Sequence, residues 1–180
     1  RPMILLQLEK PVTAPSPNSS HGCSPGSTRS VVSVHFVPVN GSGGGINFRG
    51  RGDLILTNVA LTQNQAAYGG GINFNGDGGP AFLTFKSGTI ALLNIAQVSG
   101  GGVRIEGTAR LFMLEAQTAI HSNIARGIDA GSGDPLGGFG GGLLVLGPAT
   151  ADIGSPGYNA AGAVFDNEAR RGGGIAVISD

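Results

Sequence analysis

Acidic side chains that could act in catalysis are few in this chain. Glu106, Glu115 and Asp152 are the acids nearest its centre, and their spacing gives no obvious pair. Acid and base hydrolysis of a glycosidic bond needs two carboxyl groups roughly 5 to 9.5 Å apart. A lyase acting on uronates would need an acidic calcium cluster beside a base, and only the basic residues Arg104 and Arg110 are in place. We therefore predict no catalytic residues.

Amide and charged side chains recur shortly after glycine triplets, where they alternate with apolar residues. Such alternation puts them on one face of a strand, because successive side chains of a strand point to opposite faces. On a rigid sheet, these groups could hold a polar ligand such as a glycan. The predicted ligand-binding residues are Asn47, Arg49, Asn73, Asn75, Arg104 and Glu106. An ordinary solvated face is the competing interpretation, since isolated polar residues outside a sheet are common.

Neither a metal site nor a cofactor site is predicted. The segment from Asn73 to Gly78 has the alternating oxygens and the glycine of a calcium loop, but Thr84 stands where a bidentate glutamate would be needed. A turn is the simpler interpretation of this segment. The glycine triplets precede strand-like segments, whereas phosphate-binding glycine loops open helices.

The composition excludes several classes of protein. The chain has 34 glycines, and its 11 basic and 11 acidic residues give a formal net charge of zero. No basic surface for nucleic acid is therefore expected. The apolar runs are far shorter than the ~20 residues of a membrane-spanning helix. A single cysteine, Cys23, forbids an intramolecular disulfide.

Glycine triplets divide the chain into repeats. They occur at 43–45, 69–71, 100–102, 140–142 and 172–174. Each triplet is followed by two apolar residues with a spacing of two, which predicts a strand. These pairs are Ile46/Phe48, Ile72/Phe74, Val103/Ile105, Leu143/Val145 and Ile175/Val177.

Two further features recur with the triplets. A second apolar pair follows in Leu54/Leu56, Leu83/Phe85, Leu111/Met113 and Ala151/Ile153, with three extra residues predicted around 77–80. An Asn-x-Ala motif follows at Asn64, Asn94, Asn123 and Asn167. Asparagine favours a turn, because it tolerates a left-handed backbone and bonds to neighbouring amides.

Repeats of about 30 residues with three short strands and three turns predict an all-β fold, a parallel β-helix of four to five coils. Stacked coils would pile Phe48, Phe74, Ile105, Val145 and Val177 inside one column. Glycine is favoured where the same turn is stacked in successive coils, because side chains would collide there and a positive φ is needed. Stacked asparagines would form a hydrogen-bonded ladder.

Residues 43–74 carry a resemblance to a known group, through two Gly-Gly-Gly-Ile motifs and the segment 53–64 between them. They resemble the right-handed parallel β-helix repeats of bacterial surface proteins, in particular polymorphic outer-membrane proteins and autotransporter passengers. The resemblance extends over residues 43–180, although Leu, Ile or Val usually replaces the family's Phe, and Gly replaces its Ala. It implies a right-handed solenoid, an extracellular or bacterial cell-surface location, and often adhesion.

Two parts are expected in the chain. Residues 1–42 form an N-terminal lead-in with a linker and a cap, in which Val31 to Val37 alternates as a strand would. Residues 43–180 form the β-helix repeat domain, with a loop insertion at 127–139 that is rich in glycine, serine, aspartate and proline.

Apolar residues also face outward near the C-terminal end, where we predict an interface made by Leu144, Leu146 and Ile178. Such a patch is normally covered, here by the insertion, by the run Met3 to Leu8, or by a partner. Stacking of sugar rings on aromatic side chains is not expected, because the chain lacks tryptophan, has two tyrosines, and has most of its phenylalanines in inward positions.

The expected function is a non-enzymatic, surface-exposed or secreted β-helix module for adhesion or molecular contact, belonging to a longer protein. Its expected partners are a host-surface or matrix component or a glycan, and a continuation of the β-helix or a capping partner at the C-terminal end. The alternative is a fragment of a glycan-active enzyme, a polysaccharide lyase or glycoside hydrolase, with Arg104 and Glu106 as its site.

Overall fold

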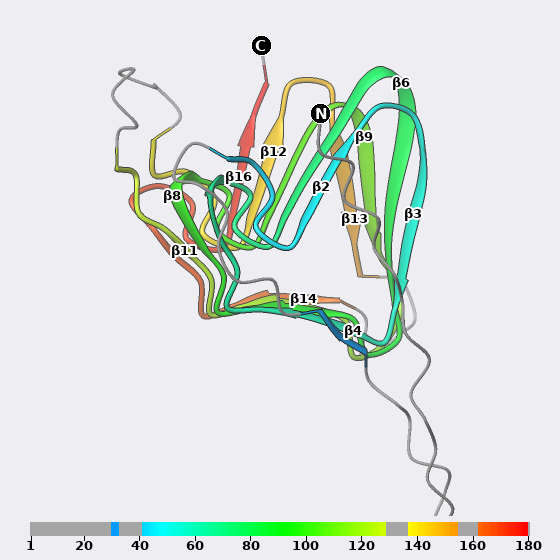
Figure 1. The fold of residues 1–180 in the computed structure, drawn as a ribbon, viewed down its shortest axis with the longest axis horizontal. Helices are drawn as coiled ribbons and strands as arrows, with labels where there is room; N and C mark the ends of the chain where they lie inside the picture. Colours follow the sequence, from blue (N-terminus) through cyan, green and yellow to red (C-terminus); the bar gives the residue numbers. More distant parts are fainter. Residues whose placement is uncertain (1–29, 33–40, 129–136, 155–161, 180) are drawn as a thin grey trace, which may run out of the picture.

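The chain folds as a parallel β-solenoid of about four turns (Figure 1). This computed structural model describes residues 30–32, 41–128, 137–154 and 162–179, and those residues contain strands but no helix. Within them, accordingly, no helix is long and apolar enough to cross a membrane. The predicted all-β parallel fold is confirmed.

Three parallel sheets form the walls of the solenoid. Sheet A contains β1 (Ser30–Val32), β4 (Val59–Thr62), β7 (Ile90–Leu92), β10 (Ala119–His121) and β14 (Ala163–Phe165). Sheet B contains β5 (Gln65–Tyr68), β8 (Ile95–Ser99), β11 (Ile124–Ala125) and β15 (Glu168–Ala169). Sheet C contains β2 (Ile46–Arg49), β3 (Gly52–Thr57), β6 (Ile72–Lys86), β9 (Val103–Met113), β12 (Leu143–Leu146), β13 (Thr150–Ile153) and β16 (Ile175–Ile178).

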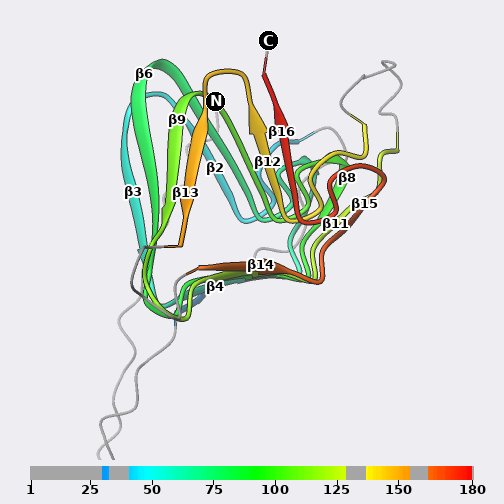
Figure 2. The same cartoon turned by 180° about the vertical axis from the view of Figure 1, so that it is seen from behind.

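One coil runs from sheet C through sheet A to sheet B, and a glycine triplet then returns the chain to sheet C. In Figure 2, β4 and β14 form the lower wall, and β3 and β13 lie at the opposite end of the molecule from β11 and β15. Each coil therefore has four strand segments where the sequence predicted three. The first two are fused into the long strands β6 and β9.

Glycine explains how these long strands change direction. Gly76 pairs with Gly107, and a Cβ atom at Gly76 would lie 2.7 Å from the amide nitrogen of Ala109 in the next coil. The register then jumps from Gly76 to Ala81 in β6 while it advances from Gly107 to Ala109 in β9. Three extra residues are thus accommodated at 77–80, as the sequence predicted.

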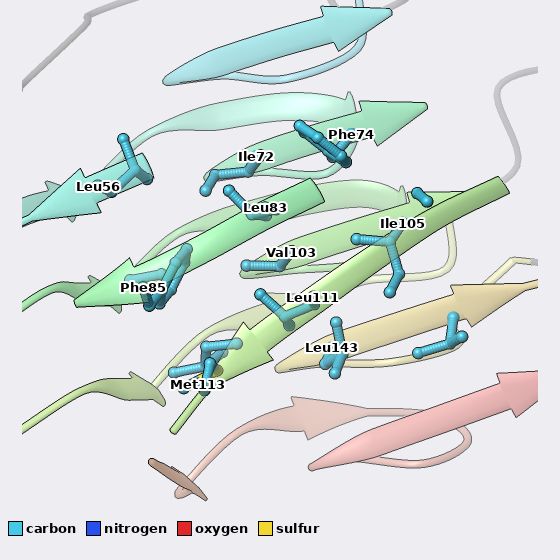
Figure 3. Close-up of a cluster of buried hydrophobic side chains, with 14 of the residues drawn as sticks. Leu56, Ile72, Phe74, Leu83, Phe85, Val103, Ile105, Leu111, Met113 and Leu143 are labelled. Atoms are coloured by element: carbon cyan, nitrogen blue, oxygen red, sulfur yellow. The ribbon is translucent and has the colours of Figure 1, made fainter. Parts of the chain in front are cut away.

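The core is a stack of apolar columns that run through the coils (Figure 3). The column predicted from the sequence exists, because the strand register pairs Phe48 with Phe74, Phe74 with Ile105, Ile105 with Val145, and Val145 with Val177. The rings of Phe48 and Phe74 stack with centroids 4.4 Å apart. A second column unites Leu54, Leu83, Leu111 and Ala151.

Asparagines form the predicted ladder at the turn between sheets A and B. The Nδ2 of Asn64 donates to Oδ1 of Asn94, that of Asn94 to Asn123, and that of Asn123 to Asn167, each over 2.9 Å. The backbone N–H of each donor residue bonds to the same oxygen. Because Asn64, Asn94 and Asn123 are buried, these bonds satisfy polar groups that would otherwise be costly to bury.

Glycine is required in the triplets for two different reasons. The first glycine of each triplet has a φ between 60° and 70°, the left-handed region that side chains disfavour. The second and third lie against neighbouring backbone: a Cβ at Gly70 would lie 2.6 Å from the carbonyl carbon of Ile95, and one at Gly71 would lie 3.0 Å from Nδ2 of Asn94. The triplets and the asparagine ladder thus pack as one unit.

The predicted division into a lead-in and a repeat domain stays a prediction, and the described residues at its edges are as follows. β1 pairs in parallel with β4, so residues 30–32 begin the stack as a strand, while 33–37 lie outside the described residues. The insertion leaves β8 of sheet B after Ile128 and returns at Gly138, since Ile128 N–H bonds to Gln97 and Gly138 N–H to Val98. Its middle, 129–136, lies outside the described residues, as does the run Met3 to Leu8, and the division at residue 42 stays a prediction.

Candidate functional site

The polar residues predicted to bind a ligand lie together on the outer face of sheet C. The register stacks Asn47 on Asn73 and Asn73 on Arg104, and the neighbouring column stacks Arg49 on Asn75 and Asn75 on Glu106. All six therefore come from three adjacent strands, β2, β6 and β9. Their apolar neighbours Ile72, Phe74 and Ile105 point into the core, which fixes the outward direction of the polar set.

A continuous network of hydrogen bonds connects five of these residues. Asn73 donates to Asn47 over 3.1 Å, and Arg104 Nη1 donates to Oδ1 of Asn73 over 3.1 Å. Glu106 accepts a bond of 2.7 Å from Nδ2 of Asn75 and forms an ion pair of 2.6 Å with Arg104. These side chains are consequently held in fixed positions on a rigid sheet.

Arg49, the sixth residue, joins this network through Asp77 in the inserted turn. Its guanidinium lies 2.9 Å from Oδ2 of Asp77, whose backbone N–H donates to Oδ1 of Asn75 over 2.7 Å. Asp77 was not predicted as part of the site, because the turn at 77–80 interrupts the repeat that marked the other residues.

Arg104 is the most enclosed charge of the set, with only 13% of its side chain exposed. Its guanidinium lies over the ring of Tyr68, 5.0 Å from the centroid, which is a cation–π arrangement. Its Nε is buried and has no hydrogen-bond partner, and the same is true of the hydroxyl of Ser99. Ser99 immediately precedes Gly100, where a Cβ atom would lie 2.8 Å from Cβ of Arg104.

The residue immediately before each glycine triplet forms a further column that the sequence analysis did not use. Backbone pairing and hydrogen bonds stack these positions in consecutive coils. The column contains Ser42, Tyr68, Ser99, Phe139 and Arg171. In the sequence, these residues share only their position directly before a glycine triplet. That shared position indicates a column once it is known that the chain returns there from sheet B to sheet C.

The predicted apolar interface lies on the same wall, in the later coils. Leu144 is fully buried and Leu146 is 8% exposed, and both cluster with Ala176, Phe139 and Ile178. Phe139 is the last residue of the predicted insertion, so one of the three covering groups named from the sequence does contact this patch. The role of Leu144, Leu146 and Ile178 in contact with a partner stays a prediction.

The three central acids have separate partners. Glu106 is paired with Arg104, whereas Asp152 accepts bonds of 2.9 and 2.6 Å from Nε and Nη2 of Arg110 on the outer face of β9 and β13. Glu115 accepts hydrogen bonds from the backbone N–H and the hydroxyl of Ser87. The backbone bond, followed by the hydroxyl bond, lowers the pKa of Glu115 below its ordinary value.

The expectation that most phenylalanines point inward is wrong. Phe48, Phe74 and Phe85 pack in the core, but the described phenylalanines outside it are Phe82, Phe112, Phe139 and Phe165. Phe82 and Phe112 lie next to each other on the outer face of sheet C with ring centroids 6.2 Å apart. The inward apolar pair of each strand was predicted correctly. The error arose because the outward residues next to these pairs were not expected to be phenylalanines.

Among residues 41–128, 137–154 and 162–179, no three His, Cys, Asp or Glu side chains are grouped as a metal site would need. The calcium-like segment 73–78 instead supplies Asn73, Asn75 and Asp77 to the network described above.

No protein family model, curated protein or solved structure matches this chain. The resemblance to bacterial surface repeats is thus supported at the level of the β-solenoid architecture, and membership of a particular family is left to proposal.

Proposed function

We propose that this chain is a non-enzymatic solenoid module, surface-exposed or secreted, that serves adhesion or molecular contact through the outer face of β2, β6 and β9. Its repeats are those of a polymorphic outer-membrane protein or autotransporter passenger. The partner is a hydroxyl-rich surface, such as a glycan or a glycan-bearing matrix component.

One observation carries this proposal. The polar network is already assembled, yet Nε of Arg104 and Oγ of Ser99 are buried without partners. Buried polar groups are normally hydrogen-bonded, and leaving one unpaired costs about 1–3 kcal/mol. Both atoms are enclosed, so the proposal includes a shift of the surrounding side chains that admits a ligand hydroxyl, which can accept a bond from Nε or exchange one with the hydroxyl of Ser99.

A binding role suits the charges of this face better than catalysis does. Glu106 is engaged by Arg104 and Asn75 together, so its carboxylate anchors the network. A rigid arrangement of donors and acceptors reduces the entropy lost on binding. The fold alone does not decide between the two roles, since solenoids carry both.

The experiment compares binding with turnover. The protein is applied to an array of neutral glycans, polyuronates and extracellular-matrix proteins, with and without calcium, and the soluble glycans are assayed for new reducing or unsaturated ends. We expect retention of the protein on at least one surface and no product. Product formation that Glu106→Gln abolishes and the matched Glu115→Gln leaves intact would establish the glycan-active enzyme instead.

Ser99→Ala sharpens the test. The substitution removes a buried unpaired hydroxyl, so it should leave the free energy of unfolding unchanged or raise it while weakening retention on the array. Arg104→Gln should also abolish retention, whereas Thr57→Ala, an exposed change on β3, should not. Retention that survives both Ser99→Ala and Arg104→Gln would place the contact elsewhere on the molecule.

A further inference from the structure

A second surface feature lies on sheet B and shares no residue with the polar network. It is a depression of about 410 Å³ on β11 and β15, where the insertion leaves the solenoid. Its lining residues are Ile124, Ala125, Arg126, Ile128, Glu168, Ala169 and Arg170. Figure 2 shows β11 and β15 side by side at this end of the molecule. The volume lies within the roughly 300–1,000 Å³ of small-ligand sites.

Two arginines in this depression occupy equivalent positions in consecutive coils. Ala125 pairs with Ala169, so Arg126 and Arg170, the next residues, are separated by one strand spacing of ~4.8 Å. Both are exposed. Like charges on directly opposed strand positions destabilise a sheet, so this pair is unfavourable unless something neutralises it.

Three other arginines of the described structure are neutralised locally, whereas Arg51 and Arg171 form no ion pair with a described residue. Arg49, Arg104 and Arg110 each form an ion pair with an acidic side chain. By contrast, the guanidinium groups of Arg126 and Arg170 have no ion pair or hydrogen bond in the part of the chain that the structure describes. Their donors are available to an external anion.

Packing at the base of the insertion holds Arg170 in position. A Cβ atom at Gly138 would lie 3.0 Å from Cβ and Cδ of Arg170, and one at Gly127 would lie 3.2 Å from the same Cδ. The aliphatic stem of Arg170 therefore covers these two glycines, and the residue lines the depression together with Arg126. An arginine fixed in this way loses less entropy when it binds.

The remaining lining residues restrict the charge and shape of a ligand. Ile124, Ala125, Ile128 and Ala169 line the depression beside its charged residues, so its surface is mixed, with apolar patches next to polar ones. Glu168 lies among them, so the two arginines and one carboxylate leave a formal charge of one positive unit. A ligand with one negative charge on an apolar body complements this surface, because its charge matches the net positive unit and its body can cover the apolar residues.

From these observations we propose that the depression binds a monocarboxylate carried on an apolar body or on a ring with an apolar face. Arg126 and Arg170 bond to the carboxylate oxygens, and guanidinium groups suit such planar, charge-assisted bonds. The apolar residues contact the body of the ligand. This site is separate from the polar network of sheet C, so its failure would leave the proposed function standing.

Backbone amide NMR of the full chain tests the proposal, with titration of benzoate against benzamide and of galacturonate against galactose up to millimolar concentrations. We expect at least one of the carboxylates to shift the amides of residues 124–128 and 168–170 at concentrations where its uncharged counterpart does not. High salt should weaken the binding. Sulfate serves as the anionic probe without an apolar body and should bind more weakly than the carboxylate, because it makes no contact with the apolar lining.

Variants that preserve packing separate the charges from the fold. Arg126→Met and Arg170→Met keep an aliphatic stem and should each weaken binding by roughly tenfold or more, as expected for a charged hydrogen bond. Glu168→Gln should tighten binding several-fold, because it removes the repelling charge. Arg51→Met, an exposed arginine elsewhere, is the matched control and should have no effect.

Several results would overturn this site. They are an absence of shifts with both carboxylates, equal binding of the charged and uncharged probes, tighter binding of sulfate, or equal weakening by Arg51→Met. If Glu168→Gln weakens binding, the assignment of charges is wrong.

Discussion

Val145 and Val177 occupy the same position in neighbouring coils, yet Val145 is 3% exposed and Val177 is 68% exposed. Val145 lies between Ile105 on one side and Val177 on the other, whereas Val177 belongs to β16 at the edge of sheet C. The two strands have the same pattern of residues. Burial of an inward side chain in this solenoid therefore depends on a neighbouring coil on each side.

Glycine shows the same difference between an inner coil and the last one. A Cβ atom at Gly102 would lie 2.7 Å from the carbonyl oxygen of Gly142 and 2.8 Å from Nδ2 of Asn123. At the equivalent Gly174, it would meet only Cγ1 of Val164, at 3.9 Å. Glycine is thus sterically required inside the stack and optional at its edge.

The largest effect is expected in the middle of the core. Phe74→Ala removes a fully buried ring that stacks on Phe48 and should lower the free energy of unfolding by about 3–5 kcal/mol. Asn75→Ala, at the next and outward position, should lower it by less than about 1 kcal/mol. Denaturant titration measures both, and equal losses would show that the assignment of inward and outward residues is wrong.

The valine pair tests the comparison directly. Val145→Ala should lower the free energy of unfolding by about 1.5–3 kcal/mol, because a buried side chain is lost and a cavity is left. Val177→Ala should change it by no more than about 0.5 kcal/mol. Urea unfolding of the two variants gives the difference. A substantial loss for Val177→Ala would reveal that another chain segment or molecule covers the last coil.

The glycine pair tests the steric requirement. Gly102→Ala forces a methyl group against backbone on the next coil and should destabilise the fold by about 1–3 kcal/mol. Gly174→Ala has space and no positive φ, so it should be neutral or stabilise slightly by reducing the freedom of the unfolded chain. Thermal unfolding compares the two variants, and similar melting temperatures would contradict the close approach of the coils.

The smallest effect concerns pH. Since the pKa of Glu115 is lowered in the folded state, its bonds to Ser87 stabilise the fold above the unfolded pKa, and this contribution is lost as the pH falls through the folded pKa. The wild type should therefore be slightly more stable than Glu115→Gln at neutral pH, with a difference that shrinks on acidification. Ser87→Ala removes only the hydroxyl donor and should give an intermediate result. A difference independent of pH would rule out the role of this carboxylate.

Much of the fold could be predicted because the repeats carry their own register. The spacing of two after each triplet identified Phe74 and Ile105 as stacked core residues, and the recurrent Asn94 and Asn123 identified the ladder. A solenoid allows this, since each coil contacts its neighbours at equivalent positions. Positions without a repeat, such as Asp77 and the outward Phe82, were not placed, because nothing in the adjacent coils marked them.

The sequence by itself determined the direction of the recurrent apolar pairs and the order of the coils, because alternation and repeat length are local properties. Only the tertiary structure decided which outward groups meet. Arg104 reaches Tyr68 and Arg126 lies beside Arg170 through the return of the chain from sheet B to sheet C and through the pairing of β11 with β15. The physical reason is that side-chain contacts between coils depend on the strand register and on the angle of the chain at each turn. Close packing of the glycine backbone fixes both only when the coils are stacked.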